Sequence, residues 1–508
     1  MFETAELGRS LSKQAFKRRE PELRQALLKA QFALRKADFP VILVFAGVDG
    51  AGKGETVKLL NEWMDPRWLK TRAFDTPSDA TRERPLFWRY WAKLPPKGQI
   101  GLLLSTWYSQ PLLRRAHGEF SDDHLVKSLD DILDFERTLA DDGALILKFW
   151  LHLGRDAQEQ RFKALEKDPL TAWRVKDRDW EHWRMYDDFV AAAETIISRT
   201  SVVHAPWHII EGQDHNYRSI RVGELLLEAL GQRLAQRPPP PPAPAPAPVE
   251  EEDIEDPVTV EVPGELTVLS HLDMSLALNK RDYKQQLQEQ QARLSALHRE
   301  AQRQGVTTVL AFEGWDASGK GGAIRRSTAA MDVRYVRIVP VAAPTDEENA
   351  HQYLWRFWRH LPRAGRVLIF DRSWYGRVLV ERVEGFAKEH EWKRAYAEIN
   401  AFESQLLEHG VVLCKFWLHI TPEEQLRRFQ ERAKTPHKAW KLTDEDWRNR
   451  ERWLEYEEAV HDMVERTSTM ASPWTLVEAN DKRFARVKVI TSVCDALEAR
   501  LAARRDVE

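Results

Sequence analysis

Cysteine is almost missing from this chain, since only Cys414 and Cys494 carry thiols among 508 residues. Two cysteines do not form a disulfide framework, and neither lies in a metal-ligand or Cys-x-x-Cys pattern. So sparse a use of cysteine is typical of a reducing compartment, and we therefore expect a cytoplasmic protein. Cys414 falls within an apolar run, so we expect it to be a buried, inert thiol.

Long apolar runs and an excess of one charge are also lacking. No run approaches the length of a membrane span, and the first residues, Met-Phe-Glu-Thr-Ala-Glu, have no signal-peptide character. The formal net charge is −3, from 76 basic and 79 acidic residues. We therefore expect neither a nucleic acid nor a membrane as partner, and any basic site must be local.

The chain does contain, in two copies, a glycine-rich segment between an apolar run and a helix-compatible stretch. The copies read Gly-Val-Asp-Gly-Ala-Gly-Lys-Gly-Glu from Gly47 and Gly-Trp-Asp-Ala-Ser-Gly-Lys-Gly-Gly from Gly314. A strand, a glycine loop and a helix start form a phosphate cradle, because backbone N–H groups and the helix dipole point at an anion and the lysine adds a positive charge. The motif predicts a phosphorylated substrate.

These copies belong to a duplication of nearly the whole chain. The offset is 267 residues (314 minus 47), and it holds without a gap as far as Pro206-Trp207 and Pro473-Trp474. The duplication predicts two globular domains, over residues 1–235 and 263–508. Residues 236–262, a proline- and alanine-rich stretch followed by an acidic run, predict an extended linker; a ligand of a proline-recognition module is the alternative.

Strand-like and helix-like stretches alternate in the same order in both halves. For the second half we expect helices over Arg281–Gln304, Gly319–Met331, Asp346–His360, Glu389–Glu408, Pro422–Arg432, Asp444–Glu465 and Lys482–Ala503, and strands over Val306–Phe312, Tyr335–Val339, Arg366–Phe370, Val411–Ile420 and Thr475–Glu478. Alternation with nearly continuous apolar strands predicts a parallel sheet covered by helices on both faces. The predicted fold class is α/β, with two tandem P-loop domains that each carry a helical lid. Ligands of such sheets bind at the carboxyl ends of the strands.

The second glycine segment supplies most groups of the expected phosphate site. The predicted phosphate-binding residues there are Gly314, Ser318, Gly319, Gly321 and Gly322, with Lys320 as the cation. The hydroxyl residue that usually follows the lysine and holds Mg²⁺ is replaced by Gly321, so another group must hold the metal. Asp316, inside the loop, is a candidate metal ligand or a base near the acceptor phosphate. An Asx turn that only shapes the loop is the alternative.

A second acid, Asp371, ends the apolar run Val367–Phe370, an arrangement in which a strand tip presents a carboxylate to Mg²⁺. Arg372 and Arg377 follow, and their guanidinium groups suit the charge that develops on a transferring phosphoryl group. The other basic residues expected to bind phosphate are Arg325, Arg326, Arg428, Arg432, Lys438 and Lys441. The last four have the pattern of a lid that closes over an anion. Because acids accompany them, a solvated helix face is the alternative.

The first half lacks the second acid and its neighbouring cations. At the positions of Asp371, Arg372, Arg377 and Arg432 it has Leu104, Ser105, Gln110 and Leu165. We therefore expect the first domain to be catalytically silent, although it keeps the fold and the lysine of the cradle, Lys53.

Three motifs of the second half together resemble the second family of polyphosphate kinases. They are Gly-x-Asp-x-x-Gly-Lys-Gly from Gly314, Asp-Arg-Ser-Trp-Tyr from Asp371 and Lys-Phe-Trp-Leu-His from Lys415, followed by the basic lid. The resemblance covers both halves almost end to end, and it implies two tandem P-loop kinase-like domains. The fused two-domain form, with Gly376 after the second motif, is similar to the AMP-phosphorylating branch of that family.

The resemblance implies a phosphotransferase that moves the terminal phosphoryl group of inorganic polyphosphate to AMP and gives ADP, with Mg²⁺ as cofactor. It also implies that Asp316, Lys320, Asp371 and Arg372 form the catalytic site, with Asp316 and Asp371 as the Mg²⁺ ligands. An ATP-dependent P-loop nucleotide kinase is one alternative, although Gly321 departs from its pattern. A non-catalytic polyphosphate-binding protein is another, although the intact Asp371-Arg372 pair argues against it. The many tryptophans permit a homo-oligomer.

Overall fold

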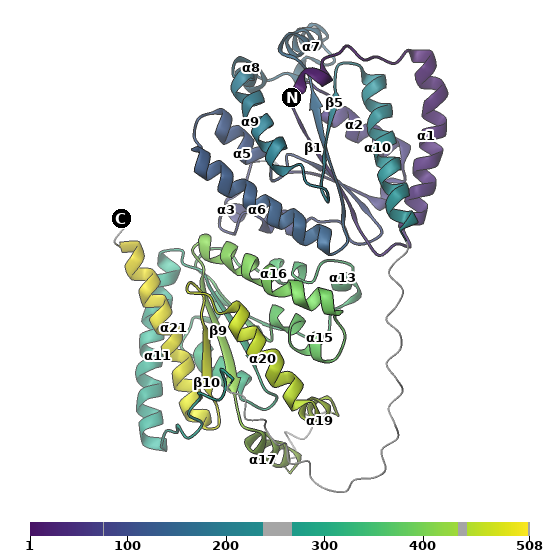
Figure 1. Ribbon diagram of the computed structural model, residues 1–508. Helices are drawn as coiled ribbons and strands as arrows, with labels where there is room; N and C mark the ends of the chain where they lie inside the picture. The colour runs from purple at the N-terminus through teal and green to yellow at the C-terminus, as the bar shows by residue number, and fades with distance from the viewer. Residues whose placement is uncertain (75, 237–266, 435–443, 506–508) are drawn as a thin grey trace, which may run out of the picture. The chain divides into compact units, whose positions relative to one another are not determined.

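The computed structural model describes residues 1–74, 76–236, 267–434 and 444–505, and it divides into two compact units (Figure 1). The first unit comprises Met1–Pro77, Arg89–Pro248 and Asp346–Gln352, and the second Ser78–Trp88, Val249–Thr345 and Tyr353–Glu508. Each unit contains one parallel five-stranded sheet, so the predicted α/β fold class is confirmed. The predicted linker falls almost wholly on residues 237–266, which lie outside the described residues, and the domain boundaries stay a prediction.

The sheet of the first unit has the strand order β2-β3-β1-β4-β5, and all its neighbours run parallel. Its strands are β1 (Val41–Gly47), β2 (Leu69–Ala73), β3 (Ile100–Leu104), β4 (Leu145–His152) and β5 (Trp207–Glu211). The helices in this half of the chain are α1 (Lys13–Leu34), α2 (Lys53–Trp63), α3 (Asp79–Arg82), α4 (Trp88–Trp91), α5 (Ser109–Ala116), α6 (Asp122–Asp141), α7 (Arg155–Lys167), α8 (Asp177–Arg184), α9 (Tyr186–Thr200) and α10 (His215–Ala235), with 3₁₀ turns η1 (Phe2–Ala5), η2 (Pro66–Trp68) and η3 (Ala172–Arg174). Helices α1 and α10 lie side by side on one face, and α6 and α9 lie on the other (Figure 1).

The sheet of the second unit has the equivalent order, β10-β9-β6-β8-β7. Its strands are β6 (Thr308–Gly314), β7 (Val336–Pro340), β8 (Val367–Asp371), β9 (Val412–His419) and β10 (Trp474–Glu478). The helices are α11 (Lys280–Arg303), α12 (Lys320–Thr328), α13 (Asp346–Asn349), α14 (Trp355–Trp358), α15 (Val380–Val383), α16 (Glu389–Glu408), α17 (Pro422–Ala433), α19 (Asp444–Glu451), α20 (Trp453–Thr467) and α21 (Lys482–Arg505), with 3₁₀ turns η4 (Val333–Tyr335) and η5 (Trp374–Arg377). Helices α11 and α21 cover one face, and α16 and α20 the other (Figure 1).

The register of the second sheet brings its functional segments to one edge. Phe312 of β6 pairs with Asp371 of β8, and Gly314 of β6 pairs with Leu418 of β9. The central strands β6, β8 and β9 are almost entirely buried, as their continuous apolar sequence predicts, whereas the edge strand β7 is largely exposed. The glycine loop after β6 and the turn after β8 therefore start next to each other, at the carboxyl ends of the central strands.

Two predicted helices are not continuous. The range Asp346–His360 holds two short helices, α13 and α14, because Tyr353, Leu354, Trp355, Phe357 and Trp358 are all buried and one helical stripe cannot bury so many successive side chains. The range Asp444–Glu465 breaks at Arg452 into α19 and α20. The other predicted helices and strands of this half agree with the structure to within a few residues at each end. None of the helices in the described ranges combines the length and the apolar composition needed to cross a bilayer.

Candidate active site

The glycine loop between β6 and α12 requires glycine at its start. Gly314 has a φ of +144°, and a Cβ there would lie 2.5 Å from the carbonyl oxygen of Leu418. Lys320, the first residue of α12, turns back and donates hydrogen bonds to the carbonyl oxygens of Gly314 and Trp315, the second at 3.2 Å. An ammonium group has three N–H donors, so one remains for a ligand. Burial lowers the pKa of Lys320, while Asp316 and Asp371 act in the opposite direction.

The turn after β8 places a carboxylate and a guanidinium at the tip of the strand. Arg372 has a φ of +65°, in the left-handed region that costs a non-glycine residue about 1 kcal/mol or more. Its backbone N–H donates to the carbonyl oxygen of Phe312, and its Nη2 lies 3.4 Å from Oδ1 of Asp316. Such a conformation persists only where the surroundings hold it in place.

Two buried glutamates hold this turn, and no motif of the sequence indicates either of them. Glu313, on β6, accepts hydrogen bonds from the backbone N–H and the hydroxyl of Ser373, both at 2.7 Å. Burial raises the pKa of Glu313. A single acid inside an otherwise apolar strand was the signal that could have identified it.

The second glutamate, Glu403 of α16, secures the end of the same turn. It accepts hydrogen bonds from Nε1 of Trp374 at 3.0 Å, from the hydroxyl of Tyr375 at 2.6 Å and from Nζ of Lys415 at 2.7 Å. The first unit repeats this network around Glu136, which binds Trp107, Tyr108 and Lys148. The tryptophan-tyrosine and lysine-phenylalanine-tryptophan motifs are therefore structural in both halves.

Asp316 lies in the glycine loop, between the turn that carries Arg372 and the helix that carries Asn449. Its Oδ2 accepts a hydrogen bond from Nδ2 of Asn449 at 2.9 Å, and Oδ1 faces Arg372. Asn449 comes from α19, which follows the predicted lid, and its Oδ1 accepts from the hydroxyl of Tyr456 at 3.2 Å. The carboxylate therefore does more than shape an Asx turn, since it connects the loop to two other segments. No feature of the sequence pointed to Asn449.

Two cavities meet at the glycine loop, and Trp315, Asp316, Lys320 and Arg372 line both of them. The smaller pocket is also lined by Glu313, Gly314, Gly376, Leu379, Val380, Trp417, Asn449 and Tyr456. The larger cavity is an open groove that is also lined by Ala317, Ser318, Gly319, Gly321, Gly322, Arg325, Arg326, Pro340, Val341, Asp371, Arg432, Asp446 and Arg486. A small pocket with apolar walls and a basic groove thus share one junction.

The groove carries a strong positive charge. Six cationic side chains line it, Lys320, Arg325, Arg326, Arg372, Arg432 and Arg486, against the three carboxylates Asp316, Asp371 and Asp446. Most of the predicted phosphate-binding residues are thus brought together here. Arg486, on α21, was missed because it lies far from every motif in the sequence.

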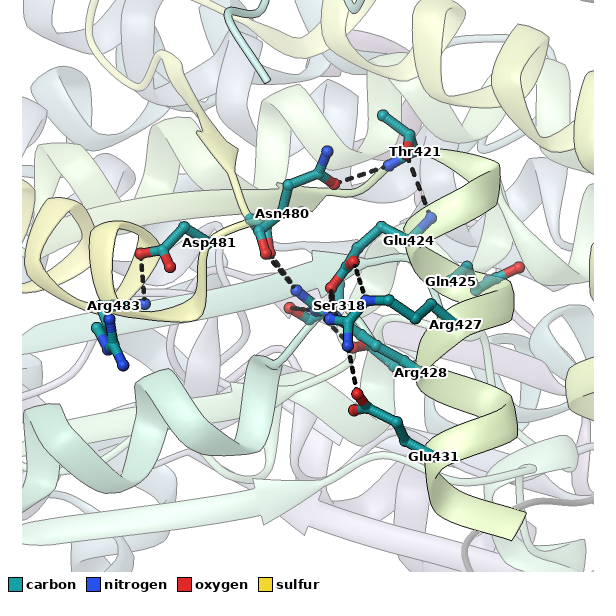
Figure 2. A network of polar contacts seen from close by, with 12 residues as sticks. Ser318, Thr421, Glu424, Gln425, Arg427, Arg428, Glu431, Asn480, Asp481 and Arg483 are labelled. Atoms are coloured by element: carbon teal, nitrogen blue, oxygen red, sulfur yellow. Dashed lines mark hydrogen bonds and ion pairs between the residues drawn. The ribbon is translucent and has the colours of Figure 1, made fainter. Parts of the chain in front are cut away.

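Arg428 does not reach the groove, which corrects the prediction that it binds phosphate. Its side chain is 2% exposed, and its five N–H donors bind Glu424 and four carbonyl oxygens (Figure 2). Those oxygens belong to Ala317, Ser318, Ala479 and Asn480, at 2.6 to 2.9 Å. A guanidinium group has no further donors, so Arg428 supports the glycine loop from behind and has none left for a phosphate.

The remaining predicted cations do not join the groove in the described part of the chain. Arg377 lies over the ring of Tyr353 at 4.5 Å and pairs with Glu381 at 3.2 Å, so it lines neither cavity. Lys438 and Lys441 lie outside the described residues. Their assignment to a lid stays a prediction.

The first unit differs at the equivalent loop. Lys53 again binds its own loop, at 2.6 Å from the carbonyl oxygen of Gly47. However, Glu55 takes the position of Gly322 and pairs with Arg161, Arg174 and Arg218 at 2.9, 3.3 and 2.9 Å. A carboxylate of the protein itself thus lies in the first turn of α2, where its charge opposes the binding of an anion at the helix start.

Comparisons with known proteins agree with this geometry. The family model described as polyphosphate kinase 2 matches residues 10–238 and again residues 277–505. The chain is 51% identical to the polyphosphate:AMP phosphotransferase of Pseudomonas aeruginosa, over 98% of this chain and 99% of that protein. It is 36% identical to the polyphosphate:AMP phosphotransferase of Acinetobacter johnsonii, over 94% and 96% of the two chains. A crystal structure of a polyphosphate kinase 2 from P. aeruginosa PA01 superposes with a TM-score of 0.87 and 48% identity, over 98% and 99% of the two chains.

Proposed function

The chain belongs to the polyphosphate kinase 2 family, and we propose that it transfers the terminal phosphoryl group of inorganic polyphosphate to AMP. The observation that carries the proposal is the junction of the two cavities. A long polyanion needs an extended cationic groove, and a mononucleotide needs a smaller pocket with apolar walls. The reacting groups of donor and acceptor then meet where Asp316, Lys320 and Arg372 line both cavities.

In the reaction an oxygen of the AMP phosphate attacks the terminal phosphorus of polyphosphate. The bond from that phosphorus to the bridging oxygen breaks, and the oxygen leaves with a chain that is one phosphate shorter. Both reactants are anions, so the cations at the junction offset their repulsion and hold them in line. The third N–H of Lys320 and the guanidinium of Arg372 are placed to stabilise charge on the transferring group. No covalent enzyme intermediate is needed.

The groove also fits the Mg²⁺ that the family implies. Asp316 and Asp371 both line it, and Mg²⁺ is typically bound by one or two carboxylates together with substrate phosphates. Within the described residues no three acidic, histidine or cysteine side chains gather into a group that could hold a metal ion by themselves. Bound there, the ion would neutralise charge on the phosphates.

The two cysteines are buried and unpaired, which agrees with a cytoplasmic location.

The test is an assay of the purified chain with AMP, polyphosphate and Mg²⁺, in which ADP is measured. We expect ADP to form with polyphosphate as donor and not with ATP in its place. ADP formation that requires ATP would favour a P-loop nucleotide kinase instead. Binding of polyphosphate without any turnover would favour a non-catalytic polyphosphate-binding protein.

A further inference from the structure

The first unit keeps a pocket at the carboxyl ends of β1 and β3, next to the glycine loop whose following helix carries Glu55 in its first turn. Ala46, Lys53 and Thr106 line this pocket, together with the aromatic side chains of Phe74, Tyr90 and Phe189. Its place corresponds to the smaller pocket of the second unit. All of its lining residues belong to the first unit.

Thr106 has a buried hydroxyl that lacks a hydrogen-bond partner among the described residues. Its side chain is 1% exposed, and its Oγ1 is unpaired. The equivalent residue of the second unit, Ser373, donates its hydroxyl to the carboxylate of Glu313 at 2.7 Å. The residue equivalent to Glu313 is Ala46, whose methyl group offers no acceptor. The first unit therefore keeps the hydroxyl donor, but it lacks the carboxylate that accepts from the equivalent hydroxyl in the second unit.

Lys53 supplies a positive charge to the same position. In the second unit the ammonium group of Lys320 acts electrostatically on Glu313, and Lys53 holds the same place on the first loop. Two of its N–H groups bind the carbonyl oxygens of Gly47 and Val48, and the third donates to Oδ1 of Asp49 over a long distance of 3.5 Å. An unpaired buried hydroxyl lowers stability, and an anionic ligand oxygen that accepts from it would recover that cost.

The other wall of the pocket is aromatic. Phe74 is half-buried and packs edge-on against Tyr90, with ring centroids 4.8 Å apart, and the guanidinium of Arg89 lies 5.3 Å from the Phe74 ring. A planar, electron-rich or polar heterocycle packs well on such a surface. A ligand with an oxyanion at one end and an aromatic ring at the other would therefore match both walls of the pocket. A small phosphate ester that carries an aromatic ring system has both groups.

We propose that this pocket binds a nucleoside monophosphate without reaction, and that a phosphate oxygen of the ligand occupies the position that the Glu313 carboxylate holds in the second unit. Phosphoryl transfer does not follow there, because the acid Glu55, paired with three arginines, lies in the first turn of α2 and Leu104 replaces the acid at the strand tip. The first half of the chain is then a binding module for the same class of ligand that the second half uses.

The experiment counts AMP molecules bound per full-length chain by isothermal titration calorimetry, without polyphosphate. The count of two that we expect rests on the proposed function for one of the sites. Ala46→Glu places a carboxylate where Thr106 can donate to it, and should reduce the count to one. Thr106→Val removes only the hydroxyl and should weaken one of the two sites roughly tenfold. Thr106→Ser keeps the hydroxyl and is the matched control, with two sites of unchanged affinity.

The outcomes separate the two proposals. If one AMP binds and Ala46→Glu abolishes it, the pocket of the first unit is supported and the acceptor site of the second is not. If one AMP binds and Ala46→Glu and Thr106→Val leave it unchanged in folded proteins, the inference is wrong. Adenosine lacks the phosphate group, so it should bind the Ala46→Glu-sensitive site more weakly than AMP does. Equal affinity of that site for adenosine and AMP would also overturn the inference.

Discussion

The burial of a single side chain, Glu313, fixes the turn after β8 at a cost in stability. Burial raises its pKa, so the ionised carboxylate is less stable in the folded protein than in the unfolded chain. Its contribution to stability is therefore fully present below the unfolded pKa, and is lost as the pH rises through the folded pKa. The hydrogen bonds to Ser373 recover part of that cost at neutral pH.

Glu313→Gln should therefore raise the melting temperature at neutral and alkaline pH. The amide oxygen can still accept from Ser373, and it carries no charge to bury. The advantage should shrink as the pH falls and the wild-type carboxyl becomes protonated. Melting curves of both proteins across a pH series measure this. An advantage that grows toward acid pH would contradict the assigned direction of the pKa shift.

Asp371→Asn should keep the fold and lose most turnover, because an amide is a poor Mg²⁺ ligand and Asp371 is one of the two carboxylates of the groove that we expect to bind the ion. The kcat for ADP formation at saturating Mg²⁺ is the measurement. Asp495→Asn, a carboxylate on α21 that pairs with Arg293 at the surface, is the control and should leave kcat unchanged. Near-wild-type activity of Asp371→Asn at saturating Mg²⁺ rejects the ligand role.

At the scale of elements, the turn after β8 depends on helix α16. Glu403→Gln should weaken the network that holds Trp374 and Tyr375 and lower kcat more than it raises KM, because Arg372 loses its fixed conformation. Glu136→Gln breaks the equivalent network of the first unit. Breaking a buried pair costs about 3–5 kcal/mol, so both variants should lose similar stability. Only Glu403→Gln should lose turnover; a similar loss in both variants would remove its positioning role.

The groove itself predicts a second effect at this scale. Arg432→Ala should raise the KM for polyphosphate more than the KM for AMP, since Arg432 lines the groove and not the smaller pocket. The increase in the KM for polyphosphate should be smaller at high salt, because dissolved ions screen the attraction between exposed charges. At an ionic strength of 0.1 M the attraction already falls off over about 10 Å. Initial rates over a salt series test this. A change confined to the KM for AMP would show that the groove binds something else.

The sequence predicted these elements better than it predicted their partners. The apolar strands and the glycine loop are local patterns, so β6, β8 and the start of α12 could be read within a few residues. Asn449, Arg486 and Glu403 lie more than 30 residues from Asp371, and only the packing of α16, α19 and α21 brings them to the site. Arg428 was assigned to phosphate because a sequence shows a charge and not the carbonyl oxygens that surround it.

At the scale of the whole molecule, the duplication explains why activity should depend on one unit. Lys320→Ala should lower the turnover of the full chain by roughly 10²–10³-fold, as the loss of one well-placed donor does elsewhere, since the first unit has Leu104 in place of the acid and we do not expect it to substitute. Lys58→Ala, an exposed lysine of α2 that pairs with Glu62, is the control. Turnover that falls only twofold in Lys320→Ala would mean that both units work.

The hydrogen bonds of Arg428 determine how the second unit can unfold locally. One guanidinium joins the loop at Ala317 and Ser318, helix α17, and the connection from β10 to α21 at Ala479 and Asn480. None of these segments can separate from the others without exposing several of its N–H groups at once. Native-state hydrogen exchange should therefore show the amides at the starts of α12, α17 and α21 becoming accessible with a common opening free energy, as one cooperative unit.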